Sequence, residues 1–177
     1  LIQEIIDLRR VTSGHHVISW RRVDVSSVIS DFASAFTEMA ERSGITYQQE
    51  IEPGIVWISD DTALKRIAGN LISNAFKYTK SEGTIKVTLV RQNDGLLFSV
   101  YNSGRGIAPE DRERIFDYYT VFDSVEESPN AGQTSRNGIG MAICHNMTKL
   151  LGGRIEIDSE VGQYAQFNVY LPEKQLP

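Results

Sequence analysis

The sequence has little of several features that would define a class of protein at once. It contains a single cysteine, Cys144, so no disulfide can form within the chain and a disulfide-stapled scaffold is excluded. Its apolar runs are a few residues long, far short of the roughly 20 residues that a membrane-spanning helix needs. Basic residues are not in excess, because 18 Lys and Arg stand against 23 Asp and Glu for a net charge of −5. This acidity argues against a nucleic-acid partner.

The composition that remains is that of an ordinary globular protein. Of the 177 residues, 41% are hydrophobic and 23% are charged, which suits one domain of roughly 150 residues with a short appendage. The chain begins with Leu1 rather than Met and no signal-peptide pattern follows. We therefore expect a segment of a longer protein, and the lone cysteine favours a reducing compartment.

Hydrophobic periodicity predicts helices interspersed with antiparallel hairpins rather than a regular strand–helix alternation. No period holds from residue 118 to 140, and so long an irregular stretch in a compact domain is usually functional. The layout favours an α+β fold, a two-layer sandwich with helices on one face of a mixed, mostly antiparallel sheet. The predicted helices span residues 1–13, 24–44, 60–78, 109–116 and 141–151, and the predicted strands span 45–51, 55–58, 84–91, 96–101, 154–159 and 164–171.

One face of the predicted 60–78 helix carries an unusual set of polar residues. Arg66, Asn70, Ser73, Asn74 and Lys77 are spaced so that they share one side. Asn and Ser are poorer helix formers than the Lys and Glu typical of a solvated face, and such local costs are expected at functional sites. Carboxamide oxygens suit Mg²⁺ and a lysine suits phosphate. A merely exposed polar face is the alternative.

Three glycine-containing elements could bring backbone close to a ligand. Residues 102–106, Asn-Ser-Gly-Arg-Gly, follow a predicted strand, and Gly138-Ile139-Gly140 opens a predicted helix. Free amides at a helix N-terminus favour phosphate oxygens. Each element alone is equally compatible with a simple turn, and for Gly162 a plain hairpin turn is the better interpretation.

The order of these elements resembles the ATP-binding catalytic domain of sensor histidine kinases, a family related to DNA gyrase B, MutL and the heat-shock chaperone ATPases. The resemblance covers roughly residues 23–172 and implies a Bergerat-type sandwich with a long ATP lid. The matching motifs are the N box at residues 70–79, the first glycine box at 102–107, the F box at 116–119 and the second glycine box at 136–142.

The resemblance assigns a role to each matched residue. Asn74 would bind Mg²⁺, Asn70 would lie beside the phosphates or share the ion, and Lys77 would contact phosphate. Tyr78 would flank the adenine, and Asn102 would accept a hydrogen bond from its amino group. Residues 118–137 would form the lid. Nucleotide binding is further assigned to Gly104, Gly106 and Ile107 of the first glycine box, and to Arg136, Gly138, Ile139, Gly140 and Met141 of the second.

Three positions depart from the family pattern. Asn102 stands where the family usually has Asp, a loss of charge that should cost roughly 1 kcal/mol, about fivefold in affinity; we expect ATP still to be preferred to GTP. This variation resembles certain hybrid two-component sensors. Tyr119 replaces the second Phe of the F box, and Ala165 replaces a Thr or Ser that often follows the third glycine.

The phosphoacceptor histidine of the family is missing. His15, His16 and His145 lack the acidic neighbour and following proline of the family's H box. We therefore expect residues 1–20 to be the end of a dimerisation helix and its linker, residues 21–173 the catalytic domain, and residues 174–177 a tail.

The leading hypothesis is a domain that binds Mg-ATP and transfers the γ-phosphate to a histidine on a dimerisation domain absent from this chain. The expected partners are that domain and the receiver domain of a response regulator. The ATP requirement and the lone cysteine together favour a cytoplasmic setting for this domain, and the sequence leaves open whether the parent protein is membrane-anchored. The parent protein would be a homodimer, and this segment a monomer or weak dimer. The alternatives are a degenerate nucleotide-binding scaffold, or an ATPase or serine kinase of the same superfamily; Asn70 disfavours hydrolysis, since it stands about where those ATPases carry a water-activating Glu and cannot act as a general base.

Overall fold

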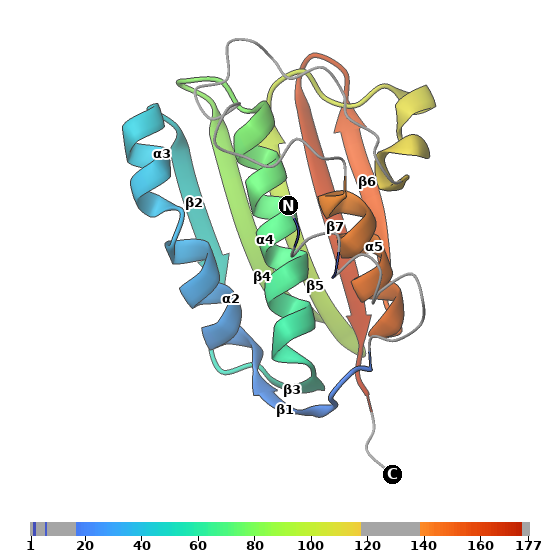
Figure 1. The fold of residues 1–177 in the computed structure, drawn as a ribbon. Coiled ribbons are helices and arrows are strands. Elements are labelled where there is room, and N and C mark those ends of the chain that lie inside the picture. Colours follow the sequence, from blue (N-terminus) through green and yellow to red (C-terminus); the bar gives the residue numbers. More distant parts are fainter. Residues whose placement is uncertain (1, 3–5, 7–16, 118–138, 175–177) are drawn as a thin grey trace.

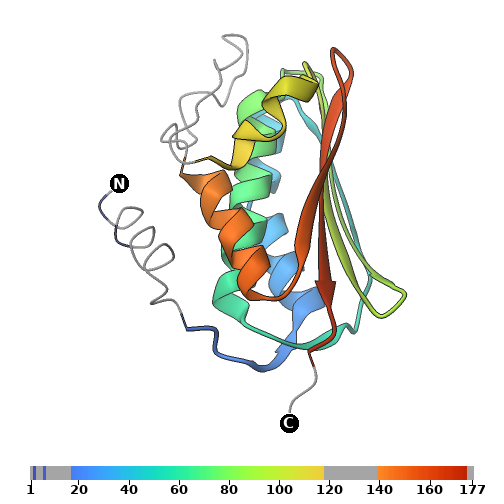
Figure 2. The same cartoon turned by 90° about the vertical axis from the view of Figure 1, so that its right-hand side faces the viewer.

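The computed structural model describes residues 2, 6, 17–117 and 139–174. Helices cover one face of a five-stranded sheet, so the molecule has two layers (Figures 1 and 2). The helical elements are α2 (Val25–Ser34), α3 (Thr37–Ser43), α4 (Asp61–Tyr78), α5 (Gly140–Leu150) and two 3₁₀ turns, η1 (Pro109–Asp111) and η2 (Arg114–Phe116). The strands are β1 (Arg21–Asp24), β2 (Thr46–Ile51), β3 (Val56–Ser59), β4 (Thr84–Gln92), β5 (Gly95–Ser103), β6 (Arg154–Glu160) and β7 (Tyr164–Pro172).

The sheet has the order β2-β4-β5-β7-β6. β2 runs parallel to β4, and the other three pairs are antiparallel. β1 and β3 form a separate antiparallel pair. The prediction of a mixed, mostly antiparallel sheet with helices on one face is therefore confirmed.

Local sequence signals set several helix ends. The Asp24 carboxylate accepts a hydrogen bond from the Ser27 amide at 3.0 Å, and Asp60 accepts one from the Ala63 amide at 3.0 Å. Each side chain satisfies an amide that the first turn of its helix leaves free. Gly44 ends α3 with a φ of +66°, a left-handed conformation that glycine adopts without a Cβ clash.

Two predicted helices differ from the structure. The segment 24–44 is divided into α2 and α3 rather than continuous. At the division Phe36 stacks on Phe76 of α4, with ring centroids 5.4 Å apart, so packing against α4 prevails over the local helical period. The segment 109–116 forms the short turns η1 and η2 instead of one helix. The predicted helix at 1–13 lies outside the described residues, apart from Ile2 and Ile6, which are helical.

α4 is the central helix of the covering layer. Its apolar side, including Leu64, Ile67 and Leu71, is buried against the inner face of the sheet, where Ile85 and Val87 of β4 are fully buried. The C-terminal half of α4, which also carries Asn70, Asn74 and Lys77, lies at the end of the sheet where β5 ends and β6 turns into β7 (Figure 1). Among the helices of the described part, none is both long and apolar enough to cross a bilayer.

Candidate nucleotide site

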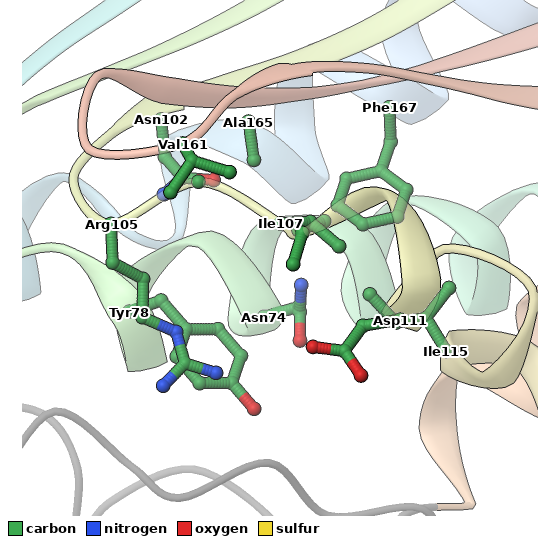
Figure 3. Close-up of a pocket in the computed structure, with 12 residues that line it drawn as sticks. Asn74, Tyr78, Asn102, Arg105, Ile107, Asp111, Ile115, Val161, Ala165 and Phe167 are labelled. Carbon is green, nitrogen blue, oxygen red and sulfur yellow. The ribbon is translucent and has the colours of Figure 1, made fainter.

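A cavity of about 320 Å³ opens at this end of the sheet. Its walls come from α4, the loop after β5, the η1–η2 segment and the turn between β6 and β7 (Figure 3). Five residues predicted to bind nucleotide line it together: Asn74, Tyr78, Asn102, Gly106 and Ile107. Residues from two motifs about thirty positions apart in the sequence therefore share one cavity.

Asn102 lies near the end of β5 and is almost fully buried. Its Nδ2 donates to the Ser103 carbonyl at 3.2 Å, so its Oδ1 is the atom left to accept from a ligand. Ala165 of β7 stands directly opposite Asn102 in the strand register and also lines the cavity. Two of the three departures from the family pattern, Asn102 and Ala165, are thus neighbours, and the cavity has neither a carboxylate nor a hydroxyl at these two positions.

The loop that follows Asn102 is tightly packed. Gly106 has a φ of +67°, and a Cβ built on it would lie 2.4 Å from the Glu160 carbonyl oxygen. Gly104 has a φ of +142° and would place a Cβ 3.1 Å from the Tyr78 carbonyl oxygen. Both glycines are therefore required by the close approach of the protein's own backbone, whereas the motif alone predicts close approach of a ligand.

Two cations lie beside Tyr78, the tyrosine of the cavity. The Arg105 guanidinium lies 5.2 Å from the centroid of the Tyr78 ring (Figure 3), and the Lys77 ammonium lies at the same distance from that ring. Burial raises the pKa of the Tyr78 phenol, and the charge of Arg105 offsets part of that rise. Tyr78 is therefore a neutral aromatic wall at ordinary pH, with positive charge next to it.

Two residues predicted to contact phosphate lie outside the cavity. Lys77 is 6% exposed and does not line it. Asn70 borders a separate shallow groove with Arg66 and Ile143. The Asn70 Oδ1 lies 2.8 Å from the position of a Cβ built on Gly140, at the first turn of α5. Asn70 therefore marks the place where α4 meets the start of α5.

The first turn of α5 begins at a residue that cannot cap it with its side chain. Ile139 occupies the N-cap position and makes no side-chain capping hydrogen bond, whereas a Ser, Thr, Asp or Asn there would accept from an amide of the first turn. Ile139 is buried and Met141 is packed against the core. Arg136, Gly138, Tyr119 and the whole predicted lid lie outside the described residues.

The structure adds cavity residues that the sequence motifs did not identify. Asp111 and Ile115 come from η1 and η2, and Phe167 comes from the inner face of β7. In Figure 3 the side chains of Asp111 and Asn74 both reach into the cavity. Alternation along β7 could have identified Phe167 as an inward-facing residue, but no local signal distinguishes Asp111. Arg105, Ala108 and Val161 complete the lining.

The two other residues considered for chemistry are structural. Cys144 is fully buried in the core, and burial raises its pKa to about 12, so its thiol is unreactive at ordinary pH. His145 stacks on Phe116 with ring centroids 4.8 Å apart. Burial, with the charge of Lys149, lowers its pKa, so this packed ring is neutral near pH 7.

The fold and the cavity define a class of protein. The chain belongs to the histidine kinase-, DNA gyrase B- and HSP90-like ATPase family, whose family model matches residues 59–175. Within that family it is an ATP-binding catalytic domain of the sensor histidine kinase type.

The chain is similar in sequence and in structure to particular sensor histidine kinases. The chain is 28% identical to the circadian input-output histidine kinase CikA of Synechococcus elongatus over 99% of its own length and 23% of CikA. The crystal structure of full-length ShkA in complex with AMPPNP superposes with a TM-score of 0.84 at 24% identity, over 99% of this chain and 35% of ShkA. The nucleotide-free catalytic domain of the histidine kinase ThkA gives a TM-score of 0.75 at 23% identity, over 89% of this chain and 99% of that one. These two structures confirm the predicted fold, and the chain spans about a quarter of the curated relative it matches here.

Proposed function

We propose that this domain binds Mg-ATP in the cavity and transfers the γ-phosphate to a histidine on a dimerisation domain that lies outside this chain. The observation that supports this most is the convergence of Asn74, Tyr78 and Asn102 on one cavity. Asn102 would provide a buried hydrogen-bond acceptor at one wall of the cavity, and Asn74 would provide a side-chain oxygen for the metal ion at another. Between them the cavity is mainly apolar, as a purine ring requires.

The base would lie between Asn102 and the apolar walls. Asn102 Oδ1 would accept a hydrogen bond from the exocyclic amino group of adenine. Ile107, Ile115 and Phe167 would remove the faces of the ring from water, with Tyr78 at its flank. Guanine presents a carbonyl where adenine presents that amino group, so the acceptor would face another acceptor. This arrangement favours ATP over GTP.

The residues present fit a magnesium ion held jointly with the phosphates. Among the described residues no group of three His, Cys, Asp or Glu side chains could hold a metal ion alone. Mg²⁺ in phosphate-binding sites uses few protein ligands and takes the remainder from phosphates and water. Asn74 would hold it through its side-chain oxygen, with Asn70 as the second assigned ligand. When bound, the ion neutralises charge on the phosphates.

The phosphates would extend toward the start of α5. The backbone amides of its first turn, at Gly140 and Met141, can donate to phosphate oxygens, and the helix dipole favours negative charge at this end. Arg136, Gly138 and the lid at residues 118–137 are proposed to complete this end of the site. Lys77 is proposed to act there through its positive charge.

The reaction needs no general base from this chain. A neutral imidazole nitrogen attacks the γ-phosphorus with its lone pair, the bond to the bridging oxygen breaks, and ADP leaves. The domain supplies position and charge neutralisation. Neither Asn70 nor Asn74 can take a proton from water, which favours transfer to a histidine over hydrolysis. The proposed partners are therefore the dimerisation domain of a homodimeric parent and, downstream, a response-regulator receiver domain.

We expect Asn102→Asp to tighten ATP binding about fivefold, since a charged acceptor forms a stronger hydrogen bond than a neutral one. Calorimetry with AMPPNP and Mg²⁺ measures this change, and the same titration with a GTP analogue measures base selectivity. The unaltered chain should bind the ATP analogue more tightly than it binds the GTP analogue. Equal or tighter binding of the GTP analogue would contradict the assignment of Asn102 to the adenine amino group.

A further inference from the structure

The loop that carries Ile107 and the turn between β6 and β7 form two walls of the cavity, and they are bonded to one another. The Gly104 amide donates to the Gln163 carbonyl at 3.1 Å, and the Gly162 amide donates to the Arg105 carbonyl at 2.7 Å. Both bonds join backbone to backbone, so they do not depend on which side chains are present. A third connection is different, because a side chain makes it.

That side chain is Ser159, near the end of β6. Its Oγ accepts a hydrogen bond from the Ile107 amide at 2.8 Å and donates one to the Tyr164 carbonyl at 2.6 Å. A hydroxyl has one proton to give and lone pairs to accept with, so both bonds can exist at once. The hydroxyl thereby bridges the glycine loop and the first residue of β7.

The backbone carbonyl of Ser159 also contacts a third wall of the cavity, the segment around η1. The Ser159 carbonyl accepts from the Arg112 Nη2 at 2.6 Å. Arg112 directly follows η1, whose Asp111 lines the cavity. The buried Nε of Arg112 has no hydrogen-bond partner in the described part of the chain, and the Nη2 bond to the Ser159 carbonyl ties the guanidinium to β6.

We infer that Ser159 is a positioning residue for the nucleotide site, an assignment that rests on the proposed function. It does not line the cavity, so it acts through the residues that do. Its hydroxyl fixes Ile107 of the glycine loop relative to β7, and its carbonyl fixes the segment that carries Asp111. The distance between the loop and the β6–β7 turn sets the width of the slot for the base. Without the hydroxyl, the Ile107 amide and the Tyr164 carbonyl each lose a partner and the slot is no longer held at one width.

Three variants test this role. Ser159→Ala removes the hydroxyl, Ser159→Thr retains it on a side chain suited to a strand, and Ser99→Ala is the matched control. Ser99 is a buried serine of β5 whose Oγ donates to the Asn168 Oδ1 at 2.7 Å, and it does not line the cavity. All three are titrated by calorimetry with AMPPNP and, separately, with adenosine.

Ser159→Ala should lower the affinity for AMPPNP and for adenosine by the same factor, about five- to tenfold, because it alters the part of the site that holds the base, which both ligands share. Ser159→Thr and Ser99→Ala should stay within about twofold of the unaltered chain. Hydrogen exchange of the Ile107 amide without nucleotide should become at least about tenfold faster in Ser159→Ala only. Failure of the unaltered chain to bind AMPPNP would refute the proposed function, whereas the exchange result would still decide whether Ser159 holds the loop.

Unchanged affinity in Ser159→Ala, or a loss for AMPPNP without a loss for adenosine, would overturn the inference. If Ser159→Ala does not fold, Ser159→Thr decides: retained affinity and slow Ile107 exchange support the role of the hydroxyl, and lost affinity in a folded protein contradicts it.

Discussion

Replacing Gly106 by alanine is expected to weaken nucleotide binding by more than about tenfold. The added Cβ would lie 2.4 Å from the Glu160 carbonyl oxygen and 3.0 Å from that of Tyr164. Backbone cannot move aside as a flexible side chain can, so the loop must shift away from the β6–β7 turn. Ile107 would move with it, and the slot for the base would change shape. Calorimetry with AMPPNP measures the loss.

Gly54→Ala is the matched control for this change. Gly54 has a φ of +73°, close to that of Gly106, but nothing lies within 4 Å of a Cβ built there, and it is not part of the cavity. Both variants carry the cost of alanine in a left-handed conformation, about 1 kcal/mol, and only Gly106→Ala adds the clash. Equal nucleotide affinity in the two variants would show that the loop adapts and that its position does not determine binding.

Asn74→Ala is expected to abolish the Mg²⁺-dependent part of nucleotide binding. Asn74 is the α4 residue proposed to hold Mg²⁺, and its side chain lines the cavity. Alanine is a better helix former than asparagine, so the melting temperature should be unchanged or slightly higher while binding falls. Titrations with AMPPNP in the presence of Mg²⁺ and of EDTA measure the difference directly.

Ser73→Ala controls for a change on the same turn of α4. Ser73 is half-buried and does not line the cavity, and its replacement should leave the Mg²⁺ dependence intact. If Asn74→Ala retains the full Mg²⁺ dependence, the ion is held elsewhere and the role assigned to Asn74 is wrong.

Local signals in the sequence predicted most of the fold. Asp24 and Asp60 cap the helices that follow them, and Gly44 ends α3 in the left-handed conformation. The hairpin of β4 and β5 follows from the turn at residues 93–95 between two runs of strand-forming residues. These features depend on side chains a few residues apart, which is the range at which a sequence can be interpreted without its fold.

Features that depend on distant partners were not predictable in the same way. The division between α2 and α3 reflects the stacking of Phe36 on Phe76, forty residues later. The cavity contributions of Asp111 and Val161 arise because η1 and the β6–β7 turn meet at one end of the sheet. Neither residue belongs to a motif, so only the folded chain brings them to the site.

The structure brings some of the site residues predicted from the motifs into the cavity and leaves others outside it. The N box and the first glycine box supplied Asn74, Tyr78 and Asn102, which the structure brings together. The structure places Asn70 and Lys77 outside the cavity, although they lie on the same helix. Their contacts with phosphate remain predictions.

Phosphate transfer from γ-labelled ATP to a separately supplied dimerisation domain decides whether this domain acts as a histidine kinase. This domain should label that partner on a histidine, giving an acid-labile and base-stable phosphate, and should not label itself. Asn74→Ala should abolish the label and Ser73→Ala should retain it. Label on this chain itself would contradict the account, and so would the absence of any transfer to the partner domains of several related histidine kinases under conditions where Mg-ATP is bound.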